Sequence, residues 1–149
     1  MLSAAEIARG VQGAVAFLWR DPRATTYFDN TTEACLRSFR VMVLVAPLQI
    51  ILLLVRYSGV TTAADEMEIF VVETISYVVD WLLFPVIFHE IARRRGWLDR
   101  YARYIGALNW INLPGMALAV VFVPLAHLAP PAIGSLVSIG LQGLFFYWF

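Results

Sequence analysis

Residues 69–104 read IFVVETISYVVDWLLFPVIFHEIARRRGWLDRYARY, and the two parts of this stretch differ in composition. The first part, 69–88, is an apolar run that at about 1.5 Å per residue is long enough to cross a ~30 Å hydrocarbon core as a helix. Because arginine-rich short loops stay on the cytoplasmic side of a membrane, the stretch predicts a transmembrane helix that ends in a cytoplasmic loop. The second part supplies the arginines, Arg93, Arg94, Arg95, Arg100 and Arg103.

Three further apolar segments surround this stretch and complete the set of candidate membrane spans. The four spans are expected at residues 39–56, 69–89, 104–128 and 132–149. Of the 149 residues, 60% are apolar and 15% are charged, which is more apolar side chain than a soluble domain of this size could bury. We therefore predict an all-α fold with a single membrane domain, a polytopic bundle of four transmembrane helices.

The chain has eleven basic residues, all of them arginine, and their positions predict an orientation. Ten lie before or at the start of the first span or between the second and third, whereas Arg56 lies at the opposite end of the spans, near Asp65, Glu66 and Glu68. This split predicts that both termini are cytoplasmic. The exclusive use of arginine favours a GC-rich bacterial genome, so the expected location is a bacterial inner membrane.

The first 20 residues predict an amphipathic helix. Ser3 and Glu6 have the spacing of a capping box, and apolar residues follow at helical intervals from Ile7. We expect this helix, 1–20, to lie in the cytoplasmic membrane interface, although a helix packed on the rest of the protein would show the same pattern. A second helix, capped by Asn30, is expected to lead into the first span.

The sequence finishes with five aromatic residues, 145–149, and no polar residue follows them. A cytoplasmic terminus usually carries a few polar or basic residues. We therefore expect the 149 residues to belong to a longer protein, one with room for another span.

Polar side chains inside the first two spans have matching spacings. Gln49 and Arg56 are seven residues apart, and so are Glu73 and Asp80, so each pair shares one face of its helix. The two spans are antiparallel, and seven residues correspond to ~10 Å of depth on each. Equal depth predicts two contacts, Arg56 with Glu73 and Gln49 with Asp80.

The third and fourth spans also carry polar stripes. Asn109 and Asn112 share a face of the third span, and Ser135, Ser138 and Gln142 share a face of the fourth. Together the stripes predict a polar seam inside the bundle. Such a seam is either interhelical hydrogen bonding that holds the helices together or a path for protons or solutes.

Asp80 is the residue that fits both interpretations equally. A carboxylate at mid-membrane costs at least ~2.5 kcal/mol, so it is rarely present without a role. A path would use Asp80 as the group that changes charge, with Glu73 beside it. Hydrogen bonding would instead pair Asp80 with a neighbouring helix, and Glu73 with Arg56.

No catalytic, metal or cofactor motif stands out in the sequence. His89 and Glu90 form half of a zinc-protease motif, but Arg93 occupies the position of the second ligand, and Glu90 is expected to pair with Arg93 or Arg94. We therefore predict no enzyme activity and no cofactor, and the zero net charge argues against a nucleic-acid partner. The arginine-rich loop is a candidate for binding lipid headgroups and equally a topology anchor, through Arg93, Arg94, Arg95, Arg100 and Arg103.

The order of these features resembles that of the bacterial Yip-domain membrane proteins. The likeness consists of an amphipathic opening, the aromatic-Asp-Pro turn FLWRDP at 17–22, and a capped helix that leads into a proline-bearing span. The resemblance covers the general layout of the chain, and its one local motif, the Asp-Pro turn, is common in proteins. The resemblance implies a helical bundle, typically of five spans, and no catalytic residues. Eukaryotic members interact with small GTPases and vesicle machinery, whereas bacterial members largely lack an assigned activity.

These observations favour a non-enzymatic membrane scaffold or assembly protein. Its expected partners are the lipid bilayer and other membrane proteins or further copies of itself. The alternative is a small transporter or channel subunit that uses Asp80 and Glu73 in an intramembrane path.

Overall fold

The computed structural model describes residues 2–59 and 65–148, which form helices and no strand. Four of the helical segments in these ranges are long and apolar enough to cross a membrane, as the sequence predicts. The elements in chain order are α1 (Ala4–Leu18), the 3₁₀ helix η1 (Ala24–Tyr27), α2 (Thr32–Ser38), α3 (Val41–Tyr57), α4 (Glu66–Arg95), α5 (Leu98–Leu128) and α6 (Pro131–Trp148).

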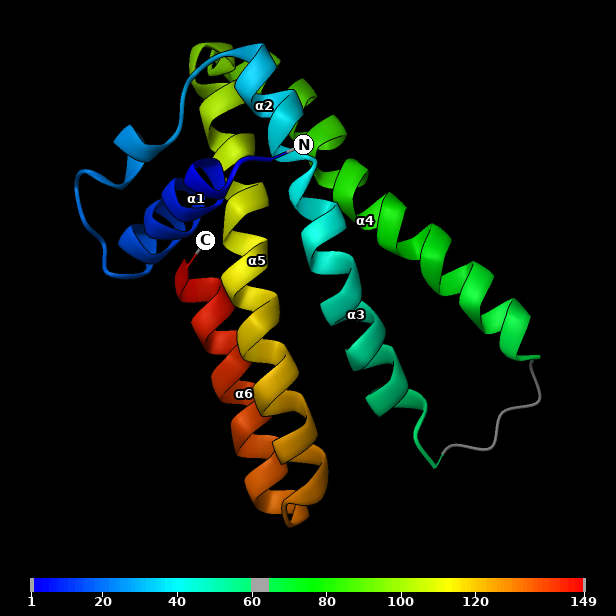
Figure 1. Ribbon diagram of the computed structural model, residues 1–149. Coiled ribbons are helices and arrows are strands. Elements are labelled where there is room, and N and C mark those ends of the chain that lie inside the picture. The colour runs from blue at the N-terminus through cyan, green and yellow to red at the C-terminus, as the bar shows by residue number, and fades with distance from the viewer. Residues whose placement is uncertain (1, 60–64, 149) are drawn as a thin grey trace.

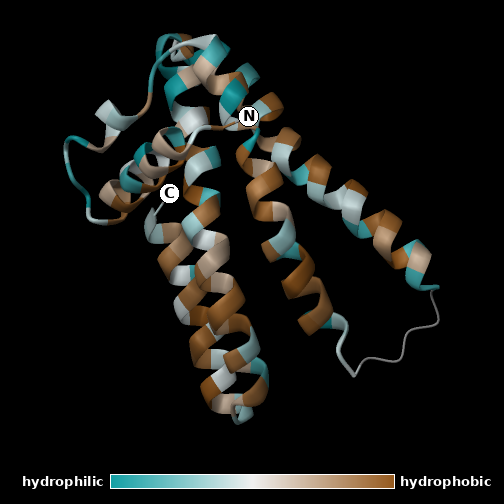
Figure 2. Ribbon diagram, in the orientation of Figure 1, coloured by the Kyte–Doolittle hydropathy of each residue, from teal (hydrophilic) through white to brown (hydrophobic). Residues whose placement is uncertain are grey.

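The four long helices do not form a closed bundle. α5 and α6 are an antiparallel pair, α3 packs on α5, and α4 meets α5 near their connection and then diverges (Figure 1). α1, η1 and α2 lie across one end of this group, close to both ends of the chain. Hydrophobic residues cover the four long helices, and hydrophilic ones gather at the end that carries α1 and α2 (Figure 2).

α1 is stabilised by a cap on its first turn and by close packing of neighbouring side chains against it. The Ser3 hydroxyl accepts a hydrogen bond from the Glu6 backbone N–H, and the Glu6 carboxylate accepts one from the Ser3 N–H, which is the predicted capping box. Gly10 and Gly13 are buried where Trp110 and Phe28 lie against the helix. A helix is present where one is predicted, while its amphipathic character and its position in a membrane interface stay predictions.

The predicted cap of the helix that leads into the first span is wrong. Thr31 caps α2 through the Ala34 N–H, whereas Asn30 donates to the Asp99 carbonyl and accepts from the Arg103 N–H at 3.1 Å, tying the segment before α2 to α5. The helix also ends at residue 38 and restarts at 41, because residues 39–40 tighten into i to i+3 hydrogen bonds.

α4 and α5 exceed the predicted spans because segments with charged residues extend them. α4 begins at Glu66 with acidic residues in its first turn and ends at Arg95, and the following Gly96 has a φ of 72°, the left-handed conformation of a helix cap. α5 begins at Leu98 and α6 at Pro131, so two short connections join the last three helices. The final residue of the predicted fourth span, Phe149, lies outside the described residues.

The core lies where α1, α3, α4 and α5 converge. Val41 and Val45 of α3 are almost fully buried and pack with Trp81 of α4 and Trp110 of α5. A second cluster, of Ala14, Ile111 and Trp148, brings α1 and the end of α6 together. In it, the indole N–H of Trp148 donates a hydrogen bond to the Ala14 carbonyl at 2.9 Å. The far halves of α3 and α4 extend beyond this core.

Candidate functional site

A cleft of about 520 Å³ separates the halves of α3 and α4 that lie nearest to their connecting segment. Its size falls in the ~300–1,000 Å³ range of ligand sites, and its walls are mostly aliphatic and aromatic. A few polar side chains interrupt the apolar wall, namely Gln49, Tyr57, Ser58, Glu66, Glu73 and Thr74.

Glu73 joins the two walls of this cleft. Its carboxylate accepts a hydrogen bond from the Tyr57 hydroxyl at 2.8 Å and one from the Arg56 guanidinium at 3.4 Å. The Glu73 side chain is only 16% exposed, whereas that of Arg56 is 63% exposed. Of the two hydrogen bonds to Glu73, the one from the tyrosine is the shorter. The predicted Arg56–Glu73 contact is confirmed. Tyr57 was missed, although its position directly after Arg56 at the helix end was a usable signal.

The structure does not bring Gln49 and Asp80 together. Gln49 lines the cleft, whereas Asp80 is exposed on α4 and is absent from the cleft wall. The prediction assumed parallel axes, but α3 and α4 diverge away from the core (Figure 1). Tyr77, four residues after Glu73, already donates at 2.6 Å to the carbonyl of Met42, which lies fifteen residues before Tyr57. Equal steps along the two helices therefore do not reach equal depth.

Asp80 continues a row of carboxylates along α4. Glu66, Glu73 and Asp80 follow one another at intervals of seven residues, so they lie on one side of the helix. Glu66 and Glu73 line the cleft, and Asp80 stands at the middle of the 30-residue helix. Within the described part of the chain, no side chain forms an ion pair with Asp80.

The remaining polar residues of the spans do not form a continuous seam. Asn109 is 2% exposed and donates to the Ser38 hydroxyl at 2.8 Å, and Ser38 donates to the Cys35 carbonyl, so this pair fastens α2 to α5. Asn112 donates at 3.3 Å to the Leu108 carbonyl of its own helix. The seam is interrupted because the splayed helices carry their stripes apart.

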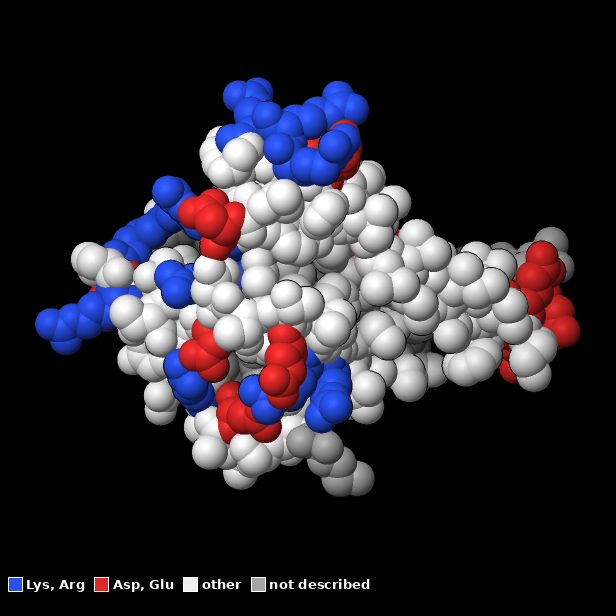
Figure 3. All heavy atoms as spheres, turned by 90° about the horizontal axis from the view of Figure 1, so that it is seen from above, with Lys and Arg blue, Asp and Glu red and all other residues white. Residues whose placement is uncertain are grey.

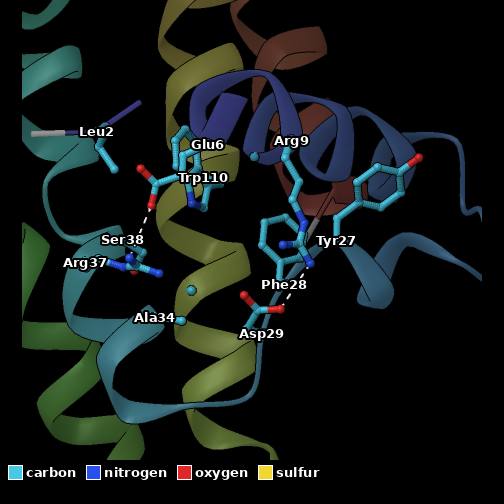
Figure 4. A pocket seen from close by; sticks show the side chains of 12 residues that line it. Leu2, Glu6, Arg9, Tyr27, Phe28, Asp29, Ala34, Arg37, Ser38 and Trp110 are labelled. Carbon is cyan, nitrogen blue, oxygen red and sulfur yellow. Dashed lines mark hydrogen bonds and ion pairs between the residues drawn. The ribbon is translucent and has the colours of Figure 1, made fainter. Parts of the chain in front are cut away.

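A second, smaller cavity of about 100 Å³ lies between α1, α2 and α5 (Figure 4). Its charged rim is internally paired, because Arg9 contacts Asp29 at 3.0 Å and Arg37 contacts Glu6 at 3.6 Å. The backbone N–H of Ser3 and the nearby arginines hold the pKa of Glu6 below its ordinary value. We assign this cavity a structural role, since its charges compensate one another.

The connection of α4 to α5 carries the predicted basic loop. Glu90 accepts hydrogen bonds from Arg93 at 2.8 Å and Arg94 at 2.7 Å, which confirms the expected local pairing. Among the described residues, no group of three or more His, Cys, Asp or Glu side chains is placed to hold a metal ion. Figure 3 shows basic side chains gathered on this end of the molecule and a separate acidic group at the far end of α4.

Comparison of the chain with protein-family models, curated proteins and solved structures finds no match.

Proposed function

We propose that the protein is a non-enzymatic membrane scaffold whose α4 binds a transmembrane helix of a partner protein beside the α3–α4 cleft. The observation that carries this proposal is the exposure of Asp80 at the middle of α4. A carboxylate facing hydrocarbon at mid-membrane costs at least ~2.5 kcal/mol, and a partner that donates a hydrogen bond or supplies a cation removes much of that cost.

The surroundings of Asp80 fit a helical partner. Val79 and Leu83, beside it on α4, are 45% and 51% exposed, so the carboxylate has exposed apolar side chains next to it. That pattern suits association of membrane helices, in which packing supplies the contact area and one hydrogen bond sets the register. The expected partner is therefore an apolar helix with a donor or cationic side chain near its middle.

Two sequence observations extend the proposal to a location and a family. They are the arginine distribution and the resemblance of the layout to the Yip-domain proteins. We place the protein in a bacterial inner membrane with both termini cytoplasmic, because ten of its eleven arginines belong to segments at one end of the spans. A family relation to the Yip-domain proteins stays a proposal on the same footing.

A photo-crosslinking amino acid at exposed Ser76, one turn before Asp80, tests the scaffold in native membranes. A single discrete protein adduct is expected, retained in Asp80→Asn because asparagine still accepts and donates hydrogen bonds, and lost in Asp80→Leu. The same probe at exposed Ile139 of α6 is the control and should give no such adduct. Adducts to lipid alone, or equal adducts from both positions, would contradict the proposal, and an adduct of twice the chain mass would identify a second copy as the occupant.

A second candidate function is cation or proton transport, favoured by the carboxylate row Glu66, Glu73 and Asp80 along one side of α4. A neighbouring subunit that covered this row would enclose an acidic path. Here Asp80→Asn should abolish a cation flux into proteoliposomes while leaving expression and the crosslinked adduct unchanged. Because the scaffold requires no flux, this measurement separates the two candidates.

A further inference from the structure

A third cavity, of about 380 Å³, lies at the corner where α4 meets α5. One residue of α4, one of the connecting turn and three of α5 line it, and four of the five are aromatic. They are Phe88, Trp97, Arg100, Tyr101 and Tyr104. The cavity therefore combines an aromatic wall with one guanidinium group at its edge.

The aromatic wall is held in place by its own contacts. The ring of Phe88 lies 4.7 Å from that of Tyr104 and 6.2 Å from that of Tyr101, measured between centroids. The Tyr101 hydroxyl donates at 2.8 Å to the carbonyl of Pro85, the proline inside α4. A surface that is already ordered loses little entropy when an apolar chain lies on it.

The arginines at this corner differ in how far their charge is compensated. Arg93 and Arg94 share the carboxylate of Glu90. Arg100 is 83% exposed, and its one acidic contact in the described chain is a 3.4 Å approach to Asp99, which is itself 66% exposed. Exposed pairs of this kind are worth little, so the Arg100 guanidinium remains free to bind another anion.

Arg95 adds a second cation on the same turn. Its guanidinium lies 5.9 Å from the centre of the Trp97 ring, and within the described residues no carboxylate pairs with it. The corner as a whole carries five arginines against Glu90 and Asp99, a net charge of +3. Arg95 and Arg100 thus flank Trp97 at the edge of the aromatic wall.

We propose that this corner is a binding site for an anionic phospholipid. The phosphate lies between Arg95 and Arg100, and the acyl chain follows Phe88 and Tyr104 toward the apolar surface of α4. The interfacial position agrees, because the cavity lies where a long apolar helix gives way to an arginine-rich turn. This site is independent of the α3–α4 cleft and of the scaffold function proposed above.

Native mass spectrometry of the purified full chain tests the headgroup contact. The protein in mild detergent is mixed with dioleoyl phosphatidylglycerol or dioleoyl phosphatidylcholine, and retained lipid is counted. Wild type should retain the anionic lipid preferentially, and Arg100→Gln should lower that retention about fivefold, the factor for one arginine at a lipid surface. Arg23→Gln, which removes an exposed arginine outside the corner, is the charge-matched control and should have no effect.

The acyl-chain contact has its own pair of variants. Tyr104→Ala should weaken retention of both lipids, whereas Phe122→Ala, at nearly the same exposure on the same helix, should not. Inorganic phosphate and glycerol phosphate carry the headgroup chemistry without a chain and should fail to displace the lipid. Equal losses in the Arg100 and Arg23 variants, or displacement by free phosphate, would overturn the proposal.

Discussion

The Tyr57 hydroxyl of α3 donates a hydrogen bond of 2.8 Å to the Glu73 carboxylate of α4, across the cleft and away from the buried core. Near the core, α4 is held through Trp81 and through the bond from Tyr77 to the Met42 carbonyl. The two helices are therefore connected at two places along the cleft, and the Tyr57–Glu73 bond is the connection that can open without disturbing the core.

Removing this bond should loosen α4. Tyr57→Phe is expected to cost about 0.6 kcal/mol, with 1.7 kcal/mol as the upper range for such bonds in membranes. Spin labels at Ser58 and Met67, both exposed, would report the loss as a broader distance distribution between the helix ends. Arg56→Gln is the control and should broaden the distance distribution less, because the Arg56 guanidinium is farther from the Glu73 carboxylate and more exposed. A larger effect from Arg56 would contradict this order.

The carboxylate at the middle of α4, Asp80, should make membrane insertion measurably less favourable. Asp80→Leu is expected to favour insertion of the isolated α4 segment by about 2.5 kcal/mol or more, since the charge stands at the helix centre. A translocon insertion assay on the segment measures this directly. Glu66→Leu, at the first residue of the helix, should change insertion much less. Equal effects at the two positions would place Asp80 away from mid-membrane.

The sequence predicted those features of the fold and site that depend on local spacing. The four spans follow from continuous apolar runs, and Glu90 with Arg93 and Arg94 follows from positions three and four residues apart on a helix. The Arg56–Glu73 contact was predictable because Arg56 lies at the end of α3 and Glu73 about two turns into α4, so one short connection fixes their relative depth.

Contacts that depend on how helices cross were beyond the sequence. Gln49 and Asp80 fail to meet because Trp81 packs into the core and sets α4 at an angle to α3. The bond from Trp148 to Ala14 joins residues 134 positions apart, and no periodicity in either segment marks it. Such pairs are decided by the packing of large side chains, which single-helix patterns do not encode.

The docking of α1 should depend on its glycines. A Cβ on Gly13 would lie 2.5 Å from Cζ of Phe28 and 2.6 Å from Cβ of Tyr27, so Gly13→Ala must displace α1 or η1 and is expected to cost about 1–3 kcal/mol. Limited proteolysis between α1 and α2 would detect the displacement. Gly143→Ala meets nothing within 4 Å and should instead stabilise α6 by up to about 1 kcal/mol. Unchanged proteolysis of the Gly13 variant would show that α1 is not packed as described.

Acid should weaken the start of α1. The pKa of Glu6 is lowered chiefly by the Ser3 backbone N–H, with smaller contributions from the Ser3 hydroxyl, Arg37 and Arg40. Because the folded state has the lower pKa, the carboxylate stabilises α1 above the ordinary value of 4.5, and this contribution is lost as the pH falls through the folded-state pKa. Proteolysis of α1 should therefore rise below pH 4.5, and Glu6→Gln should remove that rise. An identical pH profile in the variant would assign the transition to other groups.

The hydrogen bond between Asn109 and Ser38 should contribute more to thermal stability than the hydrogen bond of Asn112 within α5. Both residues are at most 2% exposed, so Ser38→Ala leaves the Asn109 amide without its acceptor and is expected to cost about 1–3 kcal/mol in thermal unfolding. Adding Asn109→Leu removes the stranded amide and should recover part of that loss, because both polar partners are then gone. Asn112→Leu is the control, since Asn112 bonds only within its own helix at 3.3 Å among the described residues. Additive losses in the Ser38 and Asn109 double variant would show that the two side chains act independently, against the fastening of α2 to α5 described here.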